Sequence, residues 1–153
     1  MYTVATELHD DGLTASTVAK IDGLYANPVC TLSGFMEGLV VEWRGWNGVR
    51  TWTSLERELA LDARHDGRGH VSLGVTLRAP GLDLDDTAWS ARSVFVLEAG
   101  EELTRLAADL SYLLRTWPPL RLSHVWRSLP PAELQMRFGF TAHPGFKSPI
   151  LRR

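Results

Sequence analysis

The feature that most constrains this chain is the segment Trp43–His70, WRGWNGVRTWTSLERELALDARHDGRGH, which gathers three tryptophans, a glycine turn and two histidines. Tryptophan buries a very large side chain, so a segment with three of them is expected to organise the fold. Neither this segment nor the rest of the chain contains a nucleophile elbow or a glycine-rich phosphate loop. The sequence therefore says more about shape than about chemistry.

Several stretches alternate apolar and polar residues, which is typical of strands with one buried face. Strands are expected at residues 2–8, 13–21, 56–65, 70–78 and 88–97. The first two flank the turn sequence His9-Asp10-Asp11-Gly12, and the next two flank Asp66-Gly67-Arg68-Gly69, so each pair predicts a hairpin. In the strand over 56–65, Glu58, Asp62 and Arg64 are expected to point outward.

Two helices are expected between these strands. The first has its N-cap at Asn27-Pro28 and ends at Arg44-Gly45, and the second covers Glu98 to Trp117 before Pro118-Pro119. The apolar face of the first helix comprises Val29, Leu32, Phe35, Met36, Leu39, Val40 and Trp43. The order ββαβββα predicts an α+β fold, an antiparallel five-stranded sheet with both helices on one face. The residues expected to be buried together are Trp43, Leu59, Leu73, Val75, Phe95, Leu106 and Leu110.

Charge and proline content change together near residue 117. Residues 1–115 carry a net charge of −7, whereas residues 116–153 carry +5 and six of the eight prolines. We therefore expect a single domain over residues 1–117 and a loosely attached or disordered Pro-rich basic tail over residues 118–153, with one or two helical turns at Ala132–Phe138. The absence of a signal-like start and the single cysteine, Cys30, predict a cytoplasmic protein that does not enter a membrane.

Three groups of residues are candidates for function. Outward carboxylates at Glu56, Glu58 and Asp62, with the acidic loop Asp83, Asp85 and Asp86, could contact a basic partner. His65 and His70 flank a turn with Asp66 and could hold a small ligand or a metal. Two polar residues that only stabilise the ends of a turn would give the same pattern. We expect no metal or other cofactor there. The three tryptophans more simply serve packing.

Gly34 and Gly38 fall opposite the apolar face of the first helix, in line with Thr31, Val41 and Gly45. Glycine inside a helix costs about 1 kcal/mol relative to alanine. The alignment predicts a bare outer stripe at which another chain, or the tail, could approach the backbone, and neutral drift toward glycine is the competing explanation.

The motifs at Trp43-Arg44-Gly45-Trp46-Asn47-Gly48, Ser54-Leu55-Glu56 and Asp66-Gly67 to Gly69-His70-Val71 resemble an uncharacterised bacterial family of unknown function. The resemblance continues through Glu98–Leu103 and covers about residues 1–115. In layout the chain is also similar to the WapI-type immunity proteins, which neutralise toxins used in contact-dependent competition. The family offers no functional residues to transfer.

The leading hypothesis is a non-enzymatic protein-binding domain, an immunity protein that blocks a basic bacterial toxin. The acidic balance of residues 1–115 suits a basic partner and argues against binding of nucleic acid by the folded domain. The alternative is a small-ligand or metal-binding domain centred on the His65–His70 turn. A structural homo-oligomer, using the bare stripe or an edge strand, is the third class.

Overall fold

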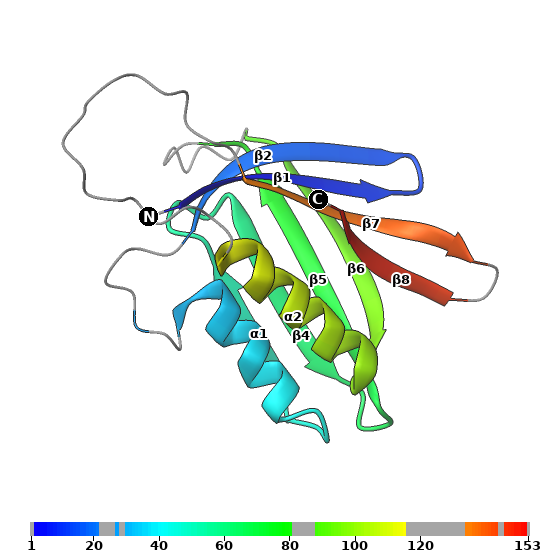
Figure 1. Ribbon diagram of the computed structural model, residues 1–153. Coiled ribbons are helices and arrows are strands. Elements are labelled where there is room, and N and C mark those ends of the chain that lie inside the picture. Colours follow the sequence, from blue (N-terminus) through cyan, green and yellow to red (C-terminus); the bar gives the residue numbers. More distant parts are fainter. Residues whose placement is uncertain are drawn as a thin grey trace.

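The computed structural model describes residues 2–21, 27, 30–80, 88–115, 134–143 and 146–152. Within them the fold is α+β, as expected, and two helices lie side by side across one face of an antiparallel four-stranded sheet (Figure 1). The strands of this sheet, in spatial order, are β3 (Val49–Thr53), β4 (Leu59–His65), β5 (His70–Arg78) and β6 (Ser90–Glu98). The predicted hairpin around Asp66–Gly69 is confirmed, with His65 opposite Val71 in the register.

The expected single five-stranded sheet is wrong, because the first hairpin belongs to a second sheet. Strands β1 (Tyr2–Asp10) and β2 (Leu13–Ile21) pair antiparallel, as predicted, and lie in the order β2-β1-β7-β8. The hairpin packs on the first sheet instead of extending it: Thr17 Oγ1 donates to the carbonyl oxygen of Arg78 at 2.8 Å, and Ser93 hydrogen-bonds Asp10. Buried apolar residues of the hairpin, such as Leu8 and Ile21, join those of the first sheet in one core.

Both helices begin later in the chain than the sequence pattern suggested. Helix α1 runs from Leu32 to Val41 with Thr31 as its N-cap, so the predicted start at Asn27 is wrong; Pro28 and Val29 lie outside the described residues. Helix α2 is Glu101–Arg115, so it starts after the predicted Glu98, and its predicted end at Trp117 lies outside the described residues.

The core lies between the β3–β6 sheet and the elements that cover it. Six of the seven predicted core residues are buried: Leu59, Leu73, Val75, Phe95, Leu106 and Leu110. The seventh, Trp43, is 49% exposed. The reason is local: α1 ends two residues before Trp43, so the helical periodicity that placed this side chain on the buried face no longer applies there.

The C-terminal stretch contributes two further strands. Strand β7 (Leu134–His143) pairs parallel with β1, and β8 (Phe146–Arg152) pairs antiparallel with β7. The helical turns expected at Ala132–Phe138 are therefore wrong over Leu134–Phe138, while the domain boundary near residue 117 lies outside the described residues and stays a prediction. Loose attachment of the tail also stays a prediction, because pairing alone does not measure how firmly a strand is held. Among the described residues, no helix is long and apolar enough to span a membrane.

Candidate binding groove between the two helices

Helix α1 is framed by residues that fix its two ends. The hydroxyl oxygen of Thr31 accepts a hydrogen bond from the N–H of Gly34 at 3.0 Å, which satisfies one of the free amides of the first turn. Beyond the other end, Gly45 has a φ of 133°, a conformation that L side chains rarely adopt. The chain therefore leaves the helix in a tight turn that carries Trp43 outward.

His65 fastens this turn to the sheet. Its Nδ1 accepts from the N–H of Gly67 at 2.8 Å, so Nε2 carries the proton and donates to the carbonyl oxygen of Trp43 at 3.0 Å. The Trp46 ring meets the imidazole edge-to-face at a centroid distance of 5.2 Å, and a Cβ on Gly45 would lie 3.4 Å from Nδ1. The position of Trp43 is thus set by the β4–β5 turn as well as by α1.

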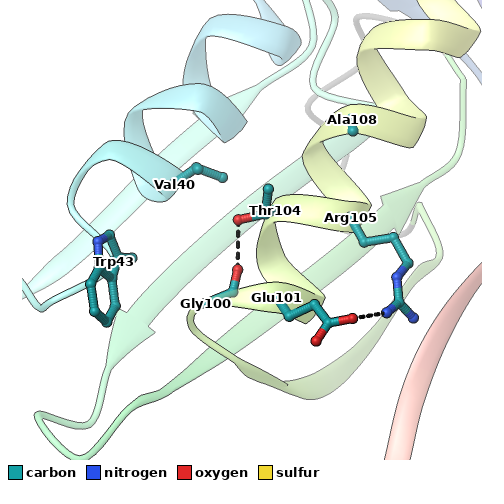
Figure 2. A pocket seen from close by; sticks show the side chains of 7 residues that line it. All are labelled: Val40, Trp43, Gly100, Glu101, Thr104, Arg105 and Ala108. Atoms are coloured by element: carbon teal, nitrogen blue, oxygen red, sulfur yellow. Dashed lines mark hydrogen bonds and ion pairs between the residues drawn. The ribbon is translucent and has the colours of Figure 1, made fainter.

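An open groove runs between the two helices, beginning at Trp43. Figure 2 shows Val40 and Trp43 on the α1 side, facing Gly100 and Thr104 at the start of α2. This part of the groove has a volume of about 460 Å³, and a second part of about 370 Å³ shares Val40, Thr104 and Ala108 with it. We call the two parts together the α1–α2 groove; its lining residues are Glu37, Val40, Val41, Trp43, Gly100, Glu101, Thr104, Arg105, Ala107, Ala108, Ser111 and Arg115.

The floor of the α1–α2 groove is built from short side chains, because α2 turns alanine, threonine and serine toward it. The two apolar residues at its rim, Val41 and Trp43, are 80% and 49% exposed. A Cβ added to Gly38 would meet nothing within 4 Å, so the backbone is open at this position of the expected bare stripe, although Gly38 does not line the groove. An apolar floor with an exposed tryptophan at its edge is the arrangement by which proteins hold apolar segments of partners.

The charged groups at the entrance to the α1–α2 groove satisfy one another. Arg105 donates to Glu101 at 2.6 Å, one helical turn apart, and the Thr104 hydroxyl donates to the carbonyl oxygen of Gly100 at 2.6 Å (Figure 2). Just before α2, the N–H groups of Gly100, Glu101 and the next residue donate to the Glu98 carboxylate and hold its pKa below the usual value. This carboxylate caps the helix, so its role is structural.

The outward carboxylate face expected at 56–62 is not formed as predicted. Glu58 is 1% exposed, and its carboxylate accepts from the Ser54 hydroxyl at 2.8 Å. Glu56 pairs with Lys20 at 2.5 Å, and this hydrogen bond raises the pKa of the lysine. The backbone explains the difference, because Arg57 has a φ of 64° and the chain bends before β4 begins.

Asp62 does point outward from β4, but it is paired with Arg92 at 2.8 Å. The ion pair lies over Gly74 of the middle strand, where a Cβ would clash with both charged groups. Partner binding by Glu56, Glu58 and Asp62 therefore stays a prediction, and the predicted loop residues Asp83, Asp85 and Asp86 lie outside the described residues.

The candidate ligand residues at the β4–β5 turn are brought together only in part, since Asp66 lies 3.3 Å from His70 Nδ1 but His65 is on the opposite face of the sheet. His65 is 9% exposed and faces the core, whereas His70 lies one register position away from Val71, on the opposite face of the sheet. Asp66 accepts from the N–H groups of His70 and Arg68, which lower its pKa. With both ring nitrogens of His65 engaged, no described group of three His, Cys, Asp or Glu side chains could hold a metal.

The groove was only partly visible in the sequence. The bare stripe expected on α1 contributes Val41 to one wall, whereas Gly34 and Gly38 are not among the lining residues, and Val40 was expected on the apolar face. The other wall was missed, since Thr104 and Ala108 are ordinary helix residues whose meeting with Val40 depends on how α1 and α2 pack.

Comparison with known proteins identifies the family over most of the chain. The model of a family of unknown function, DUF6228, matches residues 1–116, which include both helices and the β3–β6 sheet. No curated protein and no solved structure matches the chain. The matched region thus ends just after α2 and contains the whole α1–α2 groove, and the chain belongs to the DUF6228 family.

Proposed function

We propose that this protein is a non-enzymatic protein-binding domain that holds an amphipathic helix of a partner in the α1–α2 groove. The observation that carries the proposal is the open apolar groove with Val41 and Trp43 exposed at its rim. A third helix fits such a floor, because short side chains let helices approach closely and an apolar stripe is then removed from water.

The charge of the family-matched region supports a basic partner. Residues 1–115 carry a net charge of −7. Ion pairs such as Glu101–Arg105 do not change this net charge, because each pair contains one positive and one negative group. Long-range attraction speeds the capture of a positively charged protein, while contact in the groove supplies the affinity. A basic toxin neutralised by this chain is the specific form of the proposal.

The test is co-expression with the protein encoded next to this chain, scoring rescue of growth and formation of a purified complex. Trp43→Ala should weaken the complex by about 2 kcal/mol or more, about thirtyfold in Kd, as expected for an aromatic anchor. Because Trp43 is half exposed, the same change should lower the melting temperature less than truncation of a fully buried residue such as Leu73.

A matched pair of arginine substitutions tests the groove itself. Ala108→Arg places a long charged side chain on the floor, whereas Asp109→Arg adds the same side chain at the next, exposed position of α2 outside the lining. We expect only the first to abolish binding. Equal effects of the two variants contradict the groove, and failure to bind or rescue with the neighbouring product contradicts the immunity proposal.

A further inference from the structure

Strand β3 forms an edge of the β3–β6 sheet whose outer side has no strand beside it among the described residues. The N–H of Ser54 donates to the carbonyl oxygen of Leu59 at 2.8 Å. This bond shows which of the opposed residues of β3 and β4 are hydrogen-bonded to each other. Because such pairs alternate in an antiparallel ladder, Trp52 and Arg50 bond to β4. The N–H and C=O groups of Val49, Thr51 and Thr53 therefore point away from the sheet.

The other sheet edges are partly occupied, which sets β3 apart. On β2, the carbonyl oxygen of Lys20 accepts from the N–H of Leu55 at 3.0 Å, and β8 lies beside β6. Proteins usually protect an open edge with proline, lysine or a bulge. Strand β3 has none of these, and its charged residue, Arg50, is paired with Glu42.

We propose that β3 is a self-association edge, through which two copies of this chain pair antiparallel about a two-fold axis at Thr51. In this register Thr51 faces Thr51 of the second copy, and Val49 faces Thr53. The outward amides of all three residues are then hydrogen-bonded to the second copy. A register shifted by one residue would place them opposite residues whose amides point to β4. Arg50 faces Trp52, so no like charges oppose each other, and β-branched residues line the other face.

The second copy is favoured as occupant because the edge is complementary to itself in hydrogen bonding and opposes no like charges. The two four-stranded sheets would become one continuous sheet, with the α1–α2 groove of each copy outside the new contact. A strand of five residues buries little area, so the dimer should be weak and dependent on concentration. This inference does not depend on the partner proposed for the groove.

Disulfide trapping tests the register, in the full chain with the exposed Cys30 replaced by serine. Directly opposed residues in such a pair have Cα atoms about 5.5 Å apart, within reach of a disulfide. Thr51→Cys should therefore cross-link two chains under oxidation, whereas the equally exposed Thr53→Cys, which faces Val49, should not. Cross-linking of neither variant, or of both equally, would overturn the proposal.

Sedimentation equilibrium tests the association itself. Thr51→Pro removes an outward N–H without touching the β3–β4 hydrogen bonds. Thr51→Glu places two glutamates opposite each other in the dimer, in addition to Asp62, which lies opposite this position within each chain. Each should raise the dimer dissociation constant about tenfold or more. Thr51→Val retains the outward N–H and should leave the dissociation constant unchanged. A chain that is monomeric at millimolar protein, or a dimer unchanged by Thr51→Glu, would overturn the proposal.

Discussion

Replacement of His65 by leucine tests the fastening of the α1 exit turn to the sheet. The substitution places an apolar side chain at a position that is 9% exposed, and it removes the donor to Trp43 and the acceptor from Gly67. His70→Leu is the matched control, since this histidine flanks the same turn and contacts Asp66 at 3.3 Å on the exposed face.

The expected loss follows from the interactions of the imidazole. Loss of each hydrogen bond should cost about 1 kcal/mol. This value is at the lower end of the range for leaving a polar group unpaired, because the exposed Gly67 can bond to water instead. The edge-to-face contact with Trp46 adds about 0.5–1.5 kcal/mol. We therefore expect His65→Leu to lower the free energy of unfolding by about 2–4 kcal/mol, and His70→Leu to lower it much less.

Urea unfolding followed by tryptophan fluorescence measures both losses. Two polar variants separate the hydrogen bonds: His65→Asn retains an acceptor near the position of Nδ1, and His65→Gln retains a donor near that of Nε2. Each should recover part of the stability lost in the leucine variant. Equal losses at His65 and His70, or a loss below about 1 kcal/mol at His65, would refute the fastening role.

Three further predictions concern the sheet and the start of α2. Leu73→Ala should cost about 2–5 kcal/mol of unfolding free energy, because the side chain is fully buried, and an unchanged melting temperature would contradict the packing described. Gly74→Ala should displace the Asp62–Arg92 ion pair and abolish the coupling between these two residues in a double-mutant cycle. The pKa of Glu98 is lowered in the folded state, so its carboxylate stabilises the protein above the unfolded pKa and this contribution is lost as the pH falls. Glu98→Gln should accordingly be less stable than the parent at neutral pH and equally stable in strong acid; a difference that persists in acid would contradict the capping role.

The hairpins were predictable from sequence because their alternation is unbroken and each turn has its own signature. Strand β5 begins and ends at the predicted residues, His70 and Arg78. Strand β3 escaped the same analysis for a physical reason. Only Trp52 of its five residues is buried, so the strand shows no apolar alternation and is held by its pairing to β4. The two-sheet arrangement was equally hidden, since an amphipathic hairpin has the same pattern in either sheet.

The errors at the candidate sites share one cause, a periodicity extended past the end of its element. Trp43 continues the spacing of α1, but the helix ends at Val41, and Glu58 continues the alternation of β4 although the chain bends at Arg57. The resulting environments are opposite to those expected, because the tryptophan is exposed and the glutamate is buried. Both positions lie at turns, whose geometry depends on contacts far away in the sequence.

The tryptophan-rich segment and the α1–α2 groove are parts of one arrangement. The carbonyl of Trp43 is bound by His65, while its indole borders the groove beside Gly100. Leaving a tryptophan half exposed forgoes burial that a core position would give, on the order of 25 cal/mol for each Å² left in contact with water. The tryptophan therefore contributes less to folding here than the same side chain would in the core. For the proposed binding surface, the fastening of this backbone to the sheet would keep the indole preorganised at the groove rim.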